Sequence, residues 1–319
     1  MRYIILGGAG FIGGHFTDKL LNYSTTEKVT IYDNFSSGRK WHYEHHLNNN
    51  RLNVIEGNIE NTLYLKNSMI GHDVVIHLAS NPDIAKAITE PDIDFWQGTA
   101  LTNSVVESMR RSGVKRLLYA SGSGVYGDIG KEEAKENRGD LLPISTYGAS
   151  KLAGEVLIHS YCKMFDISAC AFRFGNVVGA RQTHGVGFDF IKQLLNNPNE
   201  LKILGSGAQS KSYIHVDDVI NAVLLANSEL NSDFEIYNVA TGDYITVKDI
   251  ANLVVECMGL HNVLFKYTGG DRGWKGDVPI VRLNTAKIKK LGWKCSMKTK
   301  DALKKSILDM LPSIKSGRI

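Results

Sequence analysis

The chain opens with MRYIILGGAGFIG, residues 1–13, a short apolar run followed by glycines at Gly7, Gly10 and Gly13. The apolar run predicts a buried β-strand, and the glycines let the chain turn tightly into a helix. In such a turn, backbone N–H groups at the helix N-terminus face a pyrophosphate. Asp33 closes a second apolar run twenty positions after the last of these glycines, where a carboxylate can accept hydrogen bonds from an adenosine ribose. The stretch therefore predicts a dinucleotide-binding turn.

The carboxylate of Asp33 also distinguishes between the two nicotinamide cofactors. It repels a 2′-phosphate, so it favours NAD over NADP. Arg39 lies six residues further along, and its positive charge works against this preference. We expect NAD to be the cofactor.

The composition is that of an ordinary globular protein: 319 residues, 43% of them hydrophobic, can bury a sizeable core. The net charge of +4 is slight and the basic residues are scattered, which argues against nucleic-acid binding. The four cysteines lack the C-x-x-C spacing of a zinc site and suggest no disulfide framework. No apolar stretch approaches the ~20 residues that a membrane span needs. We expect a cytoplasmic protein that binds neither nucleic acid nor membrane.

Apolar runs alternate with helical patterns through the first half of the chain. This alternation predicts a doubly wound parallel α/β sheet of the Rossmann type. After Phe174 the pattern loosens into turn-rich pieces, so we expect a Rossmann domain over residues 1–175 and a smaller C-terminal substrate-binding lobe over residues 176–319, with some segments interleaved. The strand-like runs are residues 3–6, 29–32, 52–55, 74–78, 117–119 and 169–174, and the helical patterns include 11–21, 103–111 and 147–165.

Tyr147 and Lys151 are four residues apart at the start of a predicted helix, so their side chains point the same way. A nearby ammonium, together with the positively charged nicotinamide ring of NAD⁺, is expected to lower the pKa of the tyrosine and make it a base near neutral pH. The pair alone is a weak signal, because this spacing is common. Here a predicted strand at residues 117–119 leads directly into ASGSGVYG, residues 120–127, and the pair comes later in the chain. A strand, a serine-glycine turn and then such a pair occur together much more rarely than the pair alone.

These motifs make the chain similar to the extended short-chain dehydrogenase/reductases that act on nucleotide sugars, most closely to the UDP-glucose/UDP-galactose 4-epimerase branch. The resemblance runs over almost the whole chain. It also includes HLA at residues 77–79, RFGNVVG at 173–179, YIHVDD at 213–218 and DRGWKGD at 271–277.

The resemblance implies a chemistry and a set of site residues. In such enzymes a tyrosine takes a proton from a sugar hydroxyl while a hydride passes to tightly held NAD⁺, and the 4-keto sugar turns and accepts the hydride on its other face. Tyr147 is the implied base and Lys151 its partner. Asn176, Lys211 and Arg272 are the implied contacts of the substrate's diphosphate. The implied cofactor-binding residues are Gly7, Gly10, Phe11, Ile12, Gly13, Asp33, Asn34, Asn58, Ile59, Leu78, Ala79 and Lys151.

The sequence departs from the family at the serine-glycine turn. A serine or threonine usually stands at the position of Gly122, where it hydrogen-bonds the reacting sugar oxygen. Ser121 or Ser123 is the candidate replacement. Nucleotide-sugar 4,6-dehydratases carry an Asp-Glu pair at the positions of Ser123 and Gly124, because eliminating water needs an additional acid and base. A dehydratase is therefore disfavoured. The segment 91–99 also lacks the asparagine that family members often place just before its Gly-Thr.

Histidines give no metal site in the sequence. His42, His45 and His46 lie in the polar stretch WHYEHHLNNN, and no carboxylate-rich cluster follows them at ligand spacing. We therefore expect a solvated loop and no bound metal. His77 falls inside an apolar run and is expected to be a packing residue.

Three functions remain open from the sequence. The first is an NAD-dependent nucleotide-sugar 4-epimerase that acts by transient C4 oxidation. The second is a C4 dehydrogenase that releases a 4-keto sugar nucleotide, and the third is a non-catalytic NAD-binding module. The resemblance favours UDP over GDP as the nucleotide. It also implies a homodimer that pairs through the helices at residues 103–111 and around Tyr147.

Overall fold

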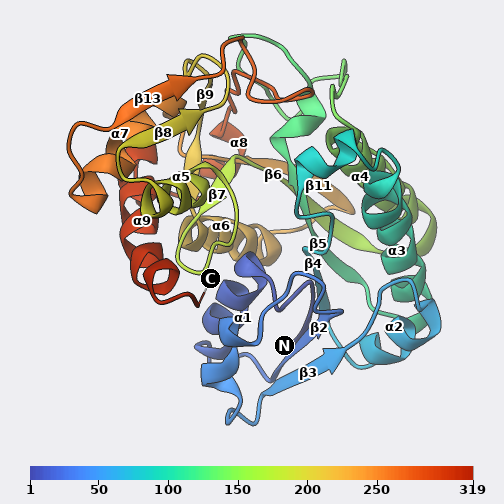
Figure 1. Ribbon diagram of the computed structural model, residues 1–319. Coiled ribbons are helices and arrows are strands. Elements are labelled where there is room, and N and C mark those ends of the chain that lie inside the picture. The colour runs from blue at the N-terminus through green and yellow to red at the C-terminus, as the bar shows by residue number, and fades with distance from the viewer. Residues whose placement is uncertain (319) are drawn as a thin grey trace. The chain divides into compact units, whose positions relative to one another are not determined.

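The apolar run that opens the chain forms strand β1 (Arg2–Leu6), whose last four residues are buried. The computed structural model describes residues 1–318, and within them β1 belongs to a seven-stranded sheet of order β11-β6-β5-β4-β1-β2-β3 (Figure 1). The pairs β1–β2, β1–β4, β2–β3 and β4–β5 are parallel. Chain order reverses between β1 and β4, as in doubly wound sheets. The predicted Rossmann-type fold is confirmed.

The predicted strands and helices of this sheet are found to within a few residues. The strands are β2 (Lys28–Asp33), β3 (Leu52–Glu56), β4 (Val74–His77), β5 (Arg116–Gly122), β6 (Ser168–Phe174) and β11 (Phe234–Val239), of which β11 was not predicted. The helices are α1 (Phe11–Leu21), α2 (Thr62–Met69), α3 (Leu101–Ser112) and α4 (Thr146–Phe165), of which α2 was not predicted.

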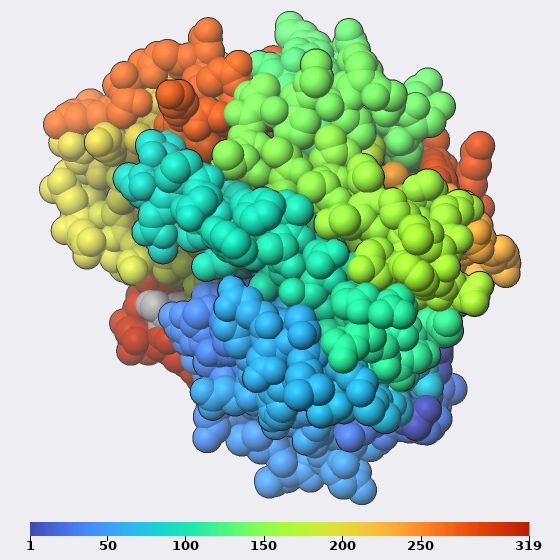
Figure 2. Space-filling view, turned by 90° about the vertical axis from the view of Figure 1, so that its right-hand side faces the viewer, coloured from blue at the N-terminus to red at the C-terminus, as the bar shows by residue number. Residues whose placement is uncertain are grey.

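Three helices cover one face of the sheet. Helix α3 packs between α2 and α4, and Figure 2 looks onto the side that carries them. Buried residues of these helices, such as Val105 and Ile158, join strand residues such as Leu117 in one hydrophobic core. Helix α1 covers the other face (Figure 1). Short helical turns, η1 (Lys40–His42), η2 (Glu44–His46), η3 (Ile84–Ile88), the π-helix η4 (Phe95–Ala100) and η5 (Ser123–Tyr126), connect these elements.

The chain divides into two compact units, each made of several segments. Unit 1 comprises Met1–Val125, Thr146–Arg173 and Ile220–Tyr237, and unit 2 comprises Tyr126–Ser145, Phe174–Val219 and the chain from Asn238 onward. The predicted division into a Rossmann domain up to residue 175 and a substrate-binding lobe after it stays a prediction.

Unit 2 has its own core and several short strand pairs. Helices α5 (Val186–Asn196), α7 (Val247–Met258) and α9 (Thr299–Lys315) pack against one another around buried residues such as Ile191, Leu253 and Ile307. The strand pairs are β7 (Asn176–Val178) with β10 (Tyr213–His215), β8 (Glu200–Ile203) with β13 (Leu264–Tyr267), and β9 (Ser210–Lys211) with β12 (Ile245–Thr246). The remaining helix of unit 2 is α8 (Ala286–Lys290), whereas α6 (Val216–Ser228) belongs to unit 1 from Ile220 onward.

No helix within residues 1–318 has both the length and the apolar character that crossing a membrane requires.

A buried ion pair anchors α4 to the sheet. Glu155 of α4 and Arg173 of β6 are only 2% and 1% exposed. The guanidinium contacts the two carboxylate oxygens at 3.0 and 2.7 Å. The hydroxyl of Ser121, on β5, donates to the same carboxylate at 2.6 Å. The contacts therefore fix one helix to two neighbouring strands.

This geometry predicts that Glu155→Ala lowers the free energy of unfolding by about 3–5 kcal/mol, because the change removes the carboxylate from a guanidinium that stays buried. Urea unfolding followed by circular dichroism measures the effect. Lys163→Ala is the matched control on the same helix: its 2.9 Å ion pair with Asp233 is exposed. It should change stability by less than about 1 kcal/mol. Equal effects of the two substitutions would contradict the anchoring role.

Candidate active site

The glycine turn after β1 leaves no room for side chains. Gly7 has φ +79°, and a Cβ atom there would lie 2.9 Å from the backbone nitrogen of Ala79. A Cβ atom on Gly13 would lie 2.6 Å from the carbonyl oxygen of Gly7. Helix α1 starts after Gly10, without a side-chain cap. Its first N–H groups are therefore available to an anion, and the turn fits a dinucleotide pyrophosphate.

Asp33 ends β2 beside this turn. Its carboxylate accepts hydrogen bonds from the N–H groups of Ala9 at 2.9 Å and Phe35 at 2.8 Å. Burial raises the pKa of Asp33, while these two hydrogen bonds act in the opposite direction. The carboxylate is thus held next to the glycine turn, as binding an adenosine ribose requires. Asn34 and Arg39, the neighbours named from the sequence, are exposed.

The other candidate cofactor residues follow the next strands of the sheet. The N–H groups of Leu78 and Ala79 both donate to the carbonyl of Leu6, at 2.9 and 3.0 Å, so the chain leaving β4 lies against the glycine turn. Asn58 and Ile59 follow β3. Asn58 is exposed, and its side chain contacts Glu60. These residues therefore lie at the carboxyl ends of parallel strands, where doubly wound sheets bind ligands.

Tyr147 and Lys151 stand on one side of the first turns of α4, as predicted. The Lys151 side chain is 3% exposed, and its Nζ donates to the carbonyl of Ala120 at 2.8 Å. The same Nζ lies 5.5 Å from the ring centroid of Tyr147. Burial lowers the pKa of Lys151 to about 8, although Asp94 and Glu155 act to raise it.

The pKa of Tyr147 differs from the expected direction. Burial raises it to about 12, Asp94 adds to the increase, and a hydrogen bond with Ser80 opposes it. Desolvation of the phenolate is therefore the dominant influence on this pKa. The chain's own side chains therefore do not produce the expected lowering, which was predicted with the positive charge of NAD⁺ included.

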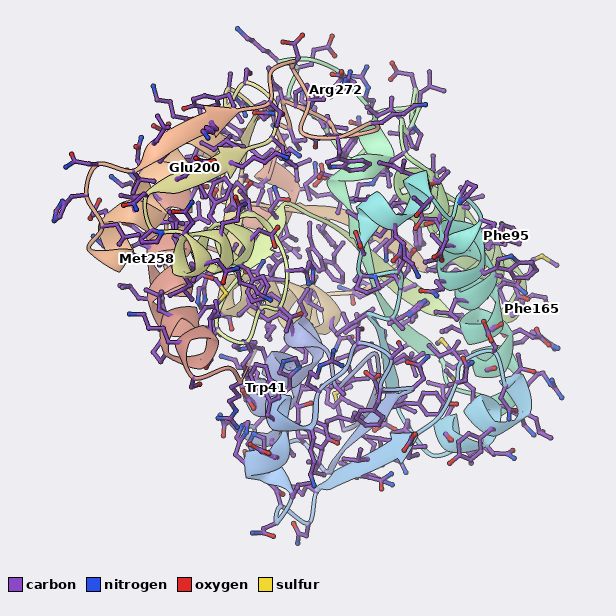
Figure 3. All side chains as sticks on the ribbon, viewed as in Figure 1. Trp41, Phe95, Phe165, Glu200, Met258 and Arg272 are labelled. Atoms are coloured by element: carbon purple, nitrogen blue, oxygen red, sulfur yellow. The ribbon has the colours of Figure 1, made fainter. Side chains whose placement is uncertain are left out.

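Asp94 is a buried carboxylate near this pair that the sequence analysis missed. It is 1% exposed, accepts from the Asn81 amide at 2.9 Å and from the Thr146 hydroxyl at 2.7 Å, and its charge acts on both Tyr147 and Lys151. It directly precedes the π-helix η4, whose wider turns shift residues relative to an α-helix. Counting residues back from the Gly-Thr at 98–99 therefore could not identify Asp94 as a neighbour of the pair. The next residue in the chain, Phe95, points outward (Figure 3).

The two candidate serines lie in different surroundings. The Ser121 hydroxyl is buried and committed to Glu155. Ser123 is half-buried in η5, and within residues 1–318 its hydroxyl makes no hydrogen bond. A Cβ atom on Gly122 would meet no described atom within 4 Å, so the glycine leaves open space where the sequence resemblance implies a hydroxyl. Ser123 is therefore the serine with a hydroxyl free to reach a ligand.

The three candidate substrate residues belong to unit 2. Asn176 is exposed at the start of β7 and donates to the carbonyl of Ser212 at 3.2 Å. Lys211 pairs with the buried Asp277 at 2.5 Å. Arg272 contacts the carbonyl of Asp277 and the carboxylate of Asp128. Lys211 and Arg272 therefore meet around one aspartate, and a diphosphate would compete with carboxylates for both.

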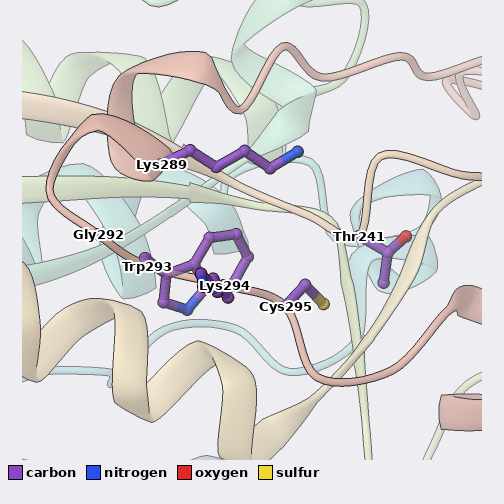
Figure 4. Close-up of a pocket in the computed structure, with 6 residues that line it drawn as sticks. All are labelled: Thr241, Lys289, Gly292, Trp293, Lys294 and Cys295. Atoms are coloured by element: carbon purple, nitrogen blue, oxygen red, sulfur yellow. The ribbon is translucent and has the colours of Figure 1, made fainter.

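A cavity of about 430 Å³ in unit 2 is lined by none of these residues (Figure 4). Trp293 forms one wall and donates its indole N–H to the carbonyl of Asp218 at 3.1 Å. The lining residues are Thr241, Lys289, Gly292, Trp293, Lys294 and Cys295.

The histidines also differ from expectation in part. His42, expected in a solvated loop, is buried, with its Nδ1 2.7 Å from the Ala9 carbonyl oxygen. His77 is buried, and burial together with Lys151 lowers its pKa to about 3, so it is a neutral packing residue as expected. His45 and His46, expected in a solvated loop without a carboxylate partner, instead both contact Asp18 of α1. Ligand spacing could not identify this carboxylate, because it lies 27 residues before His45.

The parallel sheet, the glycine turn with Asp33 and the Tyr147–Lys151 pair together define an NAD-dependent enzyme of the extended short-chain dehydrogenase/reductase class. The chain belongs to the NAD-dependent epimerase/dehydratase family, whose model matches residues 3–240. The resemblance seen in the sequence motifs and the prediction of NAD are thereby confirmed.

Similar proteins span nearly the whole chain. A putative UDP-glucose 4-epimerase of Methanocaldococcus jannaschii is 30% identical over 311 residues, 95% of this chain and 96% of that protein. UDP-glucuronic acid decarboxylase 1 of Xenopus tropicalis is 29% identical over 96% of this chain and 71% of its own. A crystal structure of a UDP-galactose 4-epimerase has a TM-score of 0.85 and 37% identity, and the match covers 97% of this chain and 98% of that one. The relatives share a family but catalyse different reactions.

Proposed function

We propose that this protein is an NAD-dependent nucleotide-sugar 4-epimerase. The observation that carries the proposal lies within unit 1. There Lys151, one turn after Tyr147 on α4, contacts β5 near its carboxyl end, and β5 belongs to the same sheet as the strands that lead into the glycine turn and Asp33. A phenol at that edge can exchange a proton with a sugar hydroxyl. The similarity to proteins named as a putative UDP-glucose 4-epimerase and a UDP-galactose 4-epimerase supports this reaction.

The chain's own residues supply proton transfer and orientation. The Tyr147 oxygen removes the proton of the sugar C4 hydroxyl and later returns one to the C4 oxygen. Lys151, held by the Ala120 carbonyl, keeps an ammonium beside the developing phenolate. Bound NAD⁺ would take up the C4 hydride and give it back, held by the glycine turn and Asp33. Ser123 is the proposed hydroxyl donor to the sugar oxygen.

Two other reactions of the family are less well supported. Dehydration needs a further acid and base, and Ser123 and Gly124 supply no carboxylate where 4,6-dehydratases carry an Asp-Glu pair. A C4 dehydrogenase that releases a 4-keto sugar nucleotide is the alternative that one observation favours. Gly122 leaves space in place of the usual hydroxyl, and losing that contact weakens the hold on the keto sugar.

We propose a UDP-sugar as the substrate, with a GDP-sugar as the alternative. The names of the three relatives above all specify UDP. Lys211 and Arg272 supply two cations for the diphosphate, with Asn176 as a neutral hydrogen-bonding partner.

A cytoplasmic location belongs to the same proposal and rests on cysteine usage: in the described chain Cys162, Cys170, Cys257 and Cys295 are all free.

The reaction predicts that Tyr147→Phe lowers kcat by about 10²–10⁴-fold, because the phenol oxygen exchanges the proton. The assay offers UDP- and GDP-sugars to the purified protein, and follows product identity and NADH absorbance. Tyr161→Phe is the matched control on the same helix and should keep its activity. Bound NAD should be retained in both variants.

The outcomes separate the candidate functions. Epimer formation without an external electron acceptor supports the epimerase. Stoichiometric reduction of bound NAD, with a released ketone and no epimer, would instead establish the dehydrogenase. A Tyr147→Phe variant indistinguishable from the unaltered protein would contradict catalysis at this site.

Asp94 contributes to the working pH of the proposed base. Its negative charge raises the pKa of both Tyr147 and Lys151. Asp94→Asn removes that charge, so both limbs of the pH profile of kcat/KM should move to lower pH. Asp92→Asn, an exposed change in the same segment, is the control and should leave the profile in place. An unmoved profile in Asp94→Asn, or one moved to higher pH, would contradict this role.

We further propose the homodimer that the resemblance implies, paired through α3 and α4 of unit 1, with η4, which packs on both helices, at the contact. Phe95 and Trp96 are 52% and 56% exposed on η4, and Val156 is 59% exposed on α4, which packs against η4. Large apolar side chains gathered on one exposed face are typical of protein–protein contacts.

Light scattering after size-exclusion chromatography should therefore give a dimer mass. The double change Trp96→Glu and Val156→Glu should give a monomer, since burying two carboxylates at the contact is unfavourable. Leu264→Glu, at a 58% exposed site on β13, is the control and should stay dimeric. A monomer mass for the unaltered protein at micromolar concentration would refute the pairing.

A further inference from the structure

The connection between β2 and β3 lies against α1 and the glycine turn. It contains η1 and η2, and Trp41, labelled in Figure 3, marks η1 next to α1. Two contacts fix its first half to the glycine turn: the Arg39 N–H donates to the Ala9 carbonyl at 2.9 Å, and the His42 Nδ1 lies 2.7 Å from the same oxygen. Its second half contacts α1 through a different group of side chains.

That group consists of Asp18, His45 and His46. The Nε2 atoms of the two histidines lie 2.8 and 2.9 Å from the same carboxylate oxygen, Oδ1 of Asp18. The two rings come from consecutive residues of η2, and their centroids are 4.2 Å apart. Three side chains from two separate elements thus bring two imidazole nitrogens and a carboxylate oxygen, all possible metal ligands, within 4.8 Å of one another.

We propose that Asp18, His45 and His46 bind a divalent transition-metal ion of the zinc class. Two imidazole nitrogens and one carboxylate oxygen form a common ligand set for such ions. At metal–ligand distances of about 2.0–2.1 Å, tetrahedral donors are about 3.3 Å apart. The three donor atoms lie within 4.8 Å of one another. Each histidine nitrogen, now 2.8 or 2.9 Å from Asp18 Oδ1, needs to move about 0.4–0.5 Å away from that oxygen to admit an ion.

The exposure of the group suits an ion that enters from solvent. The side chains of Asp18, His45 and His46 are 29%, 50% and 18% exposed. Protein covers one side of the group, and the other side leaves room for water to complete the coordination. The ion would tie the loop after Asp33 to α1, so it would act as a structural clamp on the cofactor-binding half of unit 1.

The test measures zinc bound to the full-length protein. We expect calorimetry with zinc chloride to show about one tight site in the unaltered protein, and the cobalt-substituted protein to show the visible absorption of a low-symmetry cobalt site. His45→Ala with His46→Ala should weaken zinc binding by more than about 100-fold. Zinc should raise the melting temperature of the unaltered protein and not that of the double variant.

Two further variants make the test independent of folding and of activity. Asp18→Asn keeps an oxygen donor but loses its charge, and it should weaken zinc binding less than the double histidine change does. His261→Ala removes an exposed histidine of unit 2 and should bind zinc unchanged. Circular dichroism confirms that each variant is folded. Zinc binding that is absent in the unaltered protein, or equal in the unaltered protein and the double variant, would overturn the proposal and leave hydrogen bonds as the role of the group.

Discussion

The buried contact between Glu155 and Arg173 is the constraint on which the site depends. It fixes α4 to β6, and the Ser121 hydroxyl extends it to β5. Lys151 lies one helical turn before Glu155 and reaches the Ala120 carbonyl, one residue before Ser121. The ion pair that holds α4 to the sheet and the proposed catalytic Lys151 therefore both contact the end of β5, at Ser121 and Ala120. An ion pair in this position gives the helix one register against the sheet, since sliding by a turn would bury a charge without its partner.

The unit 1 sheet and the cofactor turn could be predicted from the sequence because each rests on local patterns. Apolar runs identify strands, and Gly7 and Gly13 are required by close backbone contacts that no side chain allows. Strand β11 escaped prediction because it lies far along the chain, in a region of weak periodicity, and joins the sheet only through tertiary pairing.

The parts of the site that could not be predicted depend on distances through space. Asp94 acts on Tyr147 because the π-helix η4 and the contacts with Asn81 and Thr146 place it there. Asp18 meets His45 across a loop whose path no spacing rule describes. The pKa of Tyr147 differed from expectation for a related reason: the sequence identifies the charged neighbours of a group but not how much water the fold removes from it.

The interleaving of the two units has a consequence for synthesis on the ribosome. Unit 1 draws on residues up to Tyr237, and the edge strand β11 ends at Val239, although most of its sheet is encoded before residue 175. A nascent chain therefore exposes the unpaired edge of β6 until some sixty further residues have been translated. During that interval the cofactor-binding half is the part of the chain most open to pairing with another molecule, and chaperone contact at that edge would have its greatest effect there.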